Sequence, residues 1–168
     1  NPPINFSVPN VGYSTKKIEA ELKSMTVGIA RADEKTGDLP AGMETLIPQL
    51  WEGALKESLN KMAIFNDDAS TKVNLSVKIL KLNVPGAGFT MTTETAARYE
   101  ILDRKTGSII YTQDIVSKGE VPMDYSLMGV VRVRESVNRA VQNNITQFLQ
   151  ALQTVDVAKP MFPVVTQR

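Results

Sequence analysis

The chain has 168 residues, of which 42% are hydrophobic and 22% are charged, a balance typical of one folded globular domain. Its 19 basic and 18 acidic residues give a net charge of +1 and are interleaved along the sequence. This argues against nucleic-acid binding, because nucleic-acid binders usually concentrate basic residues on one face. Cys and His are absent, so disulfides, thiol nucleophiles, Ser-His-Asp catalysis and the usual zinc sites are excluded.

Residues 1–16 read as a lead that precedes the folded domain. They are rich in Pro, Asn and Ser and begin at Asn1 without a Met. Such a segment is typical of a trimmed start that tethers a folded body to something upstream, and a frayed terminus explains it equally well. We expect a flexible lead over 1–16, a single α+β domain over 17–156 and a C-terminal tail over 157–168.

Four stretches alternate between apolar and polar side chains, as half-buried strands do. The alternation changes phase near Lys23 and again at Leu80, which indicates a β-bulge at each place. The loop that ends at Gly107 is typical of a hairpin, so the last three strands are expected to form an antiparallel meander. The predicted strands span 17–32, 73–84, 89–101 and 108–117.

Two stretches repeat apolar residues every three or four positions, which is the pattern of an amphipathic helix. The first helix should start close to Pro48, with Thr45 as its candidate cap. The second places apolar residues from Val130 to Leu152 on one face and polar residues, among them Arg132, on the other. One sheet and two helices in the order β-α-β-β-β-α pack most economically as a two-layer α+β sandwich with a largely antiparallel sheet.

No motif in the sequence points to catalysis. A phosphate-binding P-loop is absent, and Gly86-Ala87-Gly88 lacks the third glycine and the following helix of a dinucleotide-binding loop. Acidic residues such as Asp67 and Asp68 lie in polar turns, where Asp bends the backbone more often than it binds metal. We expect no enzyme, metal or cofactor. The alternative is an enzyme with carboxylate or lysine chemistry, which requires a cleft with convergent titratable groups of perturbed pKa.

Apolar side chains in loops are the remaining candidates for a functional surface. They surround the glycine-rich turn, precede the last helix and recur in the tail. Met and aromatic side chains in loops can form adaptable binding sites, or they can fold back as lids over the sheet and the helix ends, which is the commoner arrangement. The candidate partner surface comprises Phe89, Met91, Met123, Tyr125, Met128, Met161 and Phe162.

Several segments between residues 46 and 152 share a pattern with known proteins. They are the helix start Ile47–Trp51, the strand 73–82, the hairpin 97–111, the turn Met62–Asp68 and the helical segment Glu135–Asn144. The first three, with the long last helix, resemble the auxiliary lipoprotein component of ABC-type transport systems that handle lipids. The last two resemble an uncharacterised family of small bacterial envelope lipoproteins.

This resemblance implies a non-catalytic periplasmic binding or scaffold domain that meets an envelope protein partner or a lipid. The role implied is auxiliary to lipid transport or to envelope maintenance. The resemblance also implies a lipid anchor upstream of this chain that tethers the domain to the outer membrane. No catalytic residue, cofactor or nucleic acid follows from it.

Overall fold

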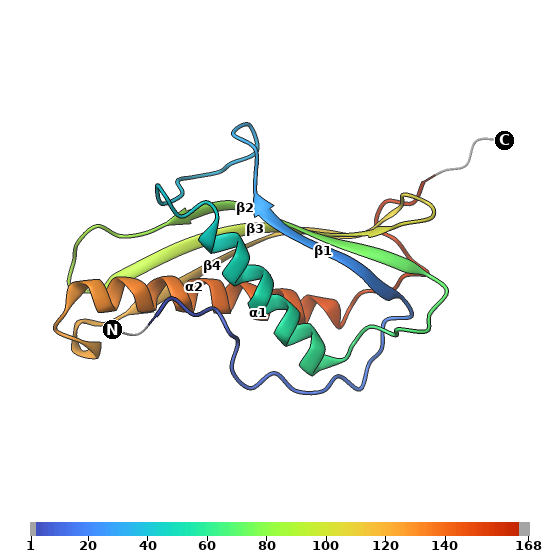
Figure 1. Cartoon of the computed structure of the whole chain (residues 1–168), viewed down its shortest axis with the longest axis horizontal. Coiled ribbons are helices and arrows are strands. Elements are labelled where there is room, and N and C mark those ends of the chain that lie inside the picture. Colours follow the sequence, from blue (N-terminus) through green and yellow to red (C-terminus); the bar gives the residue numbers. More distant parts are fainter. Residues whose placement is uncertain (1–2, 165–168) are drawn as a thin grey trace.

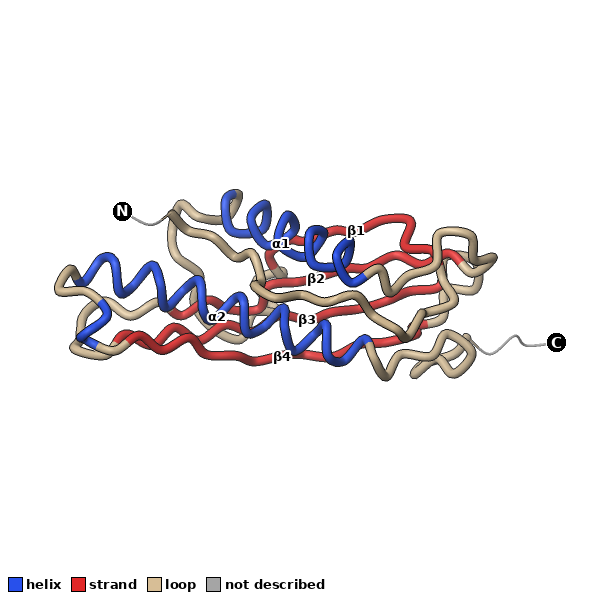
Figure 2. Tube along the Cα trace, turned by 90° about the horizontal axis from the view of Figure 1, so that it is seen from below, coloured by secondary structure: helices blue, strands red, loops and turns tan. Residues whose placement is uncertain are grey.

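The computed structural model describes residues 3–164, which form two layers: a four-stranded sheet and two helices that cover one of its faces (Figure 1 and Figure 2). The elements are β1 (Glu21–Ile29), α1 (Leu46–Met62), β2 (Lys72–Asn83), β3 (Met91–Asp103), β4 (Ile109–Val121), the short 3-10 helix η1 (Met123–Tyr125) and α2 (Gly129–Leu152). The predicted α+β class and the order β-α-β-β-β-α are therefore confirmed.

The sheet has the strand order β1-β2-β3-β4 and is mostly antiparallel, since only β1 runs parallel to its neighbour. Both predicted bulges are present, because the pairing register shifts at Lys23 in β1 and at Leu80 in β2. The second bulge turns Leu80 away from the helices, where it packs with Ala30 and Ala96 in a small separate cluster. Because the bulge adds one residue, the helix-covered face receives Ile79 before it and Leu82 after it, so the alternation in the sequence changes phase there.

A chain of hydrogen bonds between buried side chains links the two layers across the core. The indole N–H of Trp51 donates to the hydroxyl of Tyr99 over 3.3 Å, and that hydroxyl donates to Oδ1 of Asn144 over 2.8 Å. The ring of Tyr99 also stacks on Phe148, with 4.2 Å between the centroids. Burial raises the pKa of Tyr99, so its hydroxyl stays neutral and serves the packing of the core.

Residues 3–16 do not form the flexible lead that the sequence predicted. Phe6 is buried, and its ring meets Trp51 of α1 edge to face at 6.3 Å. The backbone N–H of Ser14 donates to the carbonyl of Met62 over 2.8 Å, which holds the segment against the end of α1. The expectation is wrong because the apolar side chains of this segment complete the core between the two helices.

Gly119 of β4 allows α2 to lie very close to the sheet. A Cβ atom at this position would lie 2.8 Å from Cβ of Arg139, and closer still to the carbonyl of Ser136 and the backbone nitrogen of Ala140. Two residues earlier, the hydroxyl of Ser117 donates to the carbonyl of Ala140 over 2.7 Å. Backbone contact with β4 therefore sets the position of the first half of α2.

Candidate functional site

Exposed apolar side chains gather at the end of the sheet where β2 turns into β3 and where β4 leads into α2, at the left of Figure 1. Leu127 is 94% exposed and Phe89 is 79% exposed, so neither folds back as a lid. We call this end the tip. It is defined by the exposed side chains of Phe89, Met123, Tyr125, Leu127, Met128 and Val130.

Two open hollows lie within the tip and share a wall formed by Gly88 and Arg132. The larger one, of about 520 Å³, lies between the glycine-rich loop after β2 and the first turn of α2. The smaller one, of about 360 Å³, is lined by Phe89 and Leu127 among others. An apolar rim thus surrounds a basic side chain at the centre of the tip.

Arg132 is only 8% exposed, although the sequence predicts that it lies on the polar face of α2. The reverse holds for Val130, which was expected in the core and is exposed. Val130 lies in the first turn of α2, at the end of the helix that the sheet does not cover, and its side chain therefore faces solvent. One buried side of α2 carries Arg132, Ser136 and Ala140, which are spaced by four residues, and the last two lie against Gly119 of β4.

The guanidinium of Arg132 binds backbone carbonyls in place of a carboxylate. One terminal nitrogen donates to the carbonyl of Ser126 over 2.6 Å and the other donates to the carbonyl of Gly88 over 3.3 Å. Its Nε is buried without an acceptor, and no ion pair within residues 3–164 involves this side chain. Arg132 therefore holds the two tip loops together while its charge stays unpaired.

The structure brings four of the seven predicted surface residues together at the tip. These are Phe89, Met123, Tyr125 and Met128. Met91 is 3% exposed, and its prediction as a surface residue is wrong. It is the first residue of β3, on the side of the sheet that the helices cover, and it contributes to the floor of the larger hollow.

Met161 and Phe162 are exposed but lie at the opposite end of the sheet. Phe162 forms a backbone bridge with Ile109, the first residue of β4, whereas the tip follows the last residue of that strand. The backbone N–H of Thr112 also donates to the sulfur of Met161 over 3.4 Å. The tail thus covers part of the free edge of β4, and the predicted partner surface divides into two separate places.

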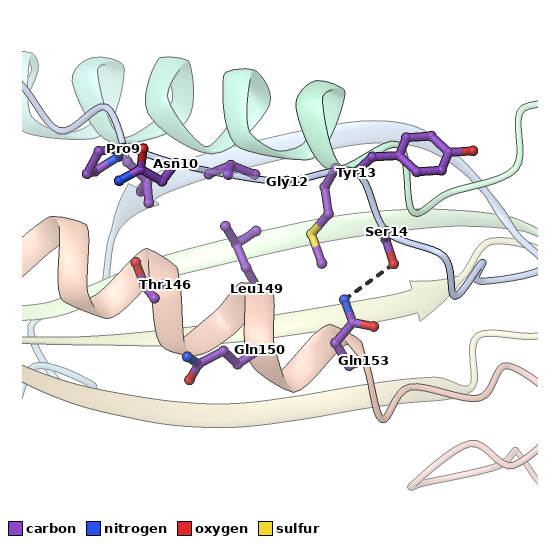
Figure 3. Close-up of a pocket in the computed structure, with 12 residues that line it drawn as sticks. Pro9, Asn10, Gly12, Tyr13, Ser14, Thr146, Leu149, Gln150 and Gln153 are labelled. Atoms are coloured by element: carbon purple, nitrogen blue, oxygen red, sulfur yellow. Dashed lines mark hydrogen bonds between the residues drawn. The ribbon is translucent and has the colours of Figure 1, made fainter.

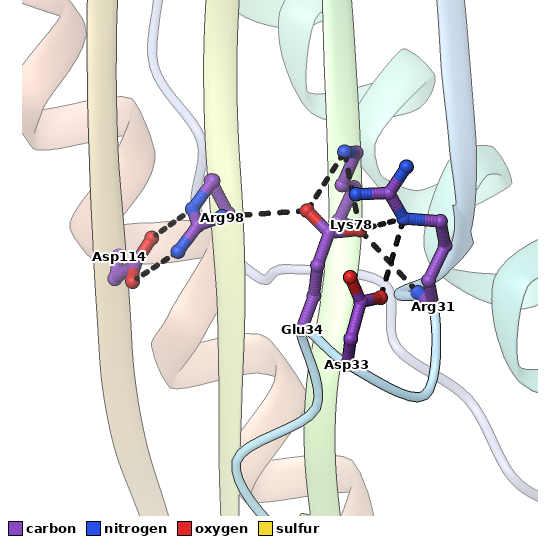
Figure 4. Close-up of polar contacts among 6 residues, drawn as sticks. All are labelled: Arg31, Asp33, Glu34, Lys78, Arg98 and Asp114. Atoms are coloured by element: carbon purple, nitrogen blue, oxygen red, sulfur yellow. Dashed lines mark hydrogen bonds and ion pairs between the residues drawn. The ribbon is translucent and has the colours of Figure 1, made fainter.

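Charged side chains form a network on the sheet face that the helices leave free (Figure 4). Lys78 donates to Glu34 over 3.0 Å, and Arg98 donates to both carboxylate oxygens of Asp114 over 2.7 and 3.0 Å. The hydrogen bond from Lys78 holds the pKa of Glu34 below its ordinary value. A carboxyl that stays ionised at neutral pH is unsuited to act as a general acid, so the network is best explained as a surface ladder of ion pairs.

Two other carboxyls also have a pKa below the ordinary value, for the same reason as Glu34. Hydrogen bonds from lysines lower the pKa of Glu21 and of Glu94, through Lys72 and Lys81 respectively. In the part of the chain that the structure describes, no group of three or more acidic side chains is arranged to hold a metal ion.

A further hollow, of about 300 Å³, lies between the segment 8–14 and the end of α2 (Figure 3). The side-chain amide of Gln153 donates to the hydroxyl of Ser14 over 3.3 Å across it. No charged side chain lines this hollow. Its lining residues are the ones through which the N-terminal segment packs against the helices. It is therefore a gap along that attachment.

Neither a protein-family model nor a curated protein matches the sequence. Among solved structures, the chain is similar to a DUF330-family protein from Xanthomonas campestris, with a TM-score of 0.57 and 10% identity over 90% of this chain and 93% of that one. It is also similar to a hypothetical protein from Chlamydia trachomatis, with a TM-score of 0.49 and 12% identity over 84% of this chain and 98% of that one. A minor lipoprotein from Acinetobacter baumannii matches with a TM-score of 0.43 and 12% identity, over 79% and 91% of the two chains. The similarity to the Xanthomonas protein shows a shared fold.

Proposed function

We propose that this chain is a non-catalytic binding domain of the bacterial cell envelope that docks on a lipid surface through its tip. The observation that carries the proposal is that six of the twelve large apolar side chains that are exposed among the described residues gather at one end of the molecule. Exposed apolar patches mark sites that meet another protein, a membrane or a ligand, because leaving such side chains in water is unfavourable.

The shape and chemistry of the tip favour lipid as the occupant. Leu127 and Phe89 project outward, as side chains that enter a bilayer surface do, and both line the smaller hollow, which is open. Tyr125 lies beside them, with the guanidinium of Arg139 5.2 Å from its ring centroid. Tyr is enriched where a protein crosses from the apolar to the polar part of a membrane. No helix among the described residues is long and apolar enough to cross a bilayer.

We further propose a periplasmic location, with a lipid anchor upstream of the chain in the outer membrane and a role in lipid transport or envelope maintenance. The shared fold with the Xanthomonas protein supports the architecture, and the resemblance of the sequence to envelope lipoproteins supports the location.

Sedimentation with phosphatidylcholine vesicles tests the proposal. The wild-type chain should sediment with the vesicles, and the double variant Phe89→Ser/Leu127→Ser should bind at least about tenfold more weakly, because each large apolar side chain contributes roughly 1.5–3 kcal/mol when it leaves water completely. The matched control is Tyr13→Ser/Phe162→Ser, which removes two exposed aromatic side chains elsewhere and should bind as the wild type does.

Two results would overturn the proposal. One is that the wild-type chain binds no vesicles of any composition. The other is that the two double variants lose binding equally. If the wild-type chain binds no vesicles but binds a protein partner through Phe89 and Leu127, that protein replaces lipid as the occupant of the tip.

A further inference from the structure

Arg132 places a basic group in the middle of the apolar tip, where it lines both hollows. The residue is nine-tenths buried. Among the described residues, its guanidinium has only the carbonyls of Gly88 and Ser126 as acceptors. Carbonyl oxygens leave the positive charge of an arginine uncompensated, whereas a carboxylate or phosphate neutralises it. Glu135, the acid nearest to Arg132 in the sequence, pairs instead with Arg139 over 3.0 Å. Asp124 of η1 is exposed and forms no ion pair with Arg132 among the described residues.

The start of α2 adds to this positive field. Its first turn contains no acidic residue, and the cap residue Met128 offers no side-chain oxygen to the free backbone N–H groups. A helix N-terminus carries a partial positive charge, which favours an anion in front of it. The larger hollow lies at this place, between the glycine-rich loop, Gly129 and Val130.

A basic centre within an apolar rim matches a ligand that combines a negative group with apolar chains. We infer that the tip selects anionic phospholipids in a bilayer, with the headgroup phosphate accepting hydrogen bonds from Arg132 in front of α2 while the rim side chains enter the acyl region. This inference rests on the proposed function, since it gives the class of lipid that the same surface binds. Arg is suited to the role because its planar guanidinium matches the geometry of phosphate oxygens.

The first experiment compares vesicles of pure phosphatidylcholine with vesicles that also contain phosphatidylglycerol. A basic side chain near an anionic surface contributes roughly a fivefold gain in binding, so the wild-type chain should prefer the anionic vesicles by about that factor or more. Arg132→Gln should remove most of this preference. Arg134→Gln, the control two residues further along the same helix, removes an equal charge outside the hollows and should retain most of it.

Arg132 also ties the two tip loops together, so its loss can loosen them. A second pair of variants avoids this difficulty. Val130→Glu introduces an acid at the start of α2, where it stabilises the helix and cancels the charge of the site, while Arg132 keeps its carbonyl contacts. Val116→Glu makes the same exchange on the free face of β4, where the side chain is equally exposed. Only the first variant should lose the preference for anionic vesicles, and its melting temperature should not fall.

The outcomes separate this inference from the proposed function. Equal binding of the wild-type chain to both kinds of vesicle overturns the headgroup selectivity and leaves docking intact, whereas binding to neither overturns both. Equal losses in Arg132→Gln and Arg134→Gln, or in Val130→Glu and Val116→Glu, also overturn the inference, because they assign the preference to net charge alone. Competition by inorganic phosphate at matched ionic strength would show a site for a free anion in place of a lipid headgroup.

Discussion

Gly119→Ala is expected to destabilise the protein strongly, because it places a methyl group between two backbones. The new Cβ would lie less than 3.0 Å from three atoms of α2, and two of them belong to the helix backbone. Backbone atoms cannot turn aside as a flexible side chain does. Even the most distant of the three contacts requires a separation of about 0.6 Å more to reach ordinary packing, so α2 must move away from β4.

The cost follows from the contacts that this movement disturbs. Overpacking a core position typically costs about 1–3 kcal/mol. The hydroxyls of Thr93 in β3 and Ser136 in α2 are 2.7 Å apart and buried, and Ser117 of β4 donates to the carbonyl of Ala140 in α2. A shift of α2 disturbs both contacts. A buried hydrogen bond contributes about 1 kcal/mol. We therefore expect a loss of about 3 kcal/mol or more, which for a chain of this size lowers the melting temperature by roughly 6–12 °C.

Thermal and urea unfolding, followed by the fluorescence of Trp51, measure this loss. Trp51 is the single Trp of the chain and is fully buried, so its emission reports on the core. The matched control is Gly28→Ala in β1, where a Cβ meets nothing within 4 Å, and its stability should be unchanged or slightly higher, since Ala suits a strand better than Gly. Equal melting temperatures for Gly119→Ala and the wild type would refute the argument from close approach.

Three further changes test other parts of the structure. Phe6→Ala should lower the urea midpoint by the equivalent of about 3–5 kcal/mol, as the loss of a buried phenyl ring does, whereas a free N-terminal segment would tolerate it without change. Asn144→Ala leaves the buried hydroxyl of Tyr99 without an acceptor, so a loss of about 1–3 kcal/mol in urea unfolding is expected; a neutral result would contradict the role of the buried chain of hydrogen bonds. Glu34 has a pKa below its ordinary value of 4.5 in the folded protein, so its stabilisation is present above that pH and is lost as the pH falls through the folded-state pKa. The melting temperatures of Glu34→Gln and the wild type should therefore differ most at neutral pH and converge in acid, and a difference that grows in acid would be inconsistent with this sign.

The fold was predictable because its signals are local. The two bulges could be recognised in the sequence, since one extra residue at Lys23 or Leu80 shifts the phase of the apolar–polar alternation in the rest of the strand. Thr45 occupies the cap position of α1 as predicted, but its side chain makes no capping hydrogen bond. The helix is held instead by the packing of its buried side chains on the sheet. Local pattern thus gave the elements and their order.

The candidate site was only partly predictable, because burial depends on what lies opposite a residue. Arg132 stands where a helical wheel predicts solvent, and only the small residues at 119, 136 and 140 show that this row meets the sheet. The burial of Phe6 likewise depends on Trp51, which lies far along the chain. Phe89 lies near the loop before α2 because β3 and β4 pair antiparallel, with Met91 opposite Val121. The predicted meander implies the direction of this pairing but not its register.

The single parallel pair in the sheet has a consequence for the order in which the protein folds. Glu21 of β1 pairs with Lys72 of β2, across the whole of α1, whereas β2, β3 and β4 pair through short connections. Contacts between distant parts of a chain form late because closing a long loop costs more entropy. The meander and α2, which carry the tip, should therefore assemble first, and β1 should join last. The backbone amides of β1 should accordingly exchange with deuterium before those of β3, so the docking end can stay ordered while the far edge of the sheet opens.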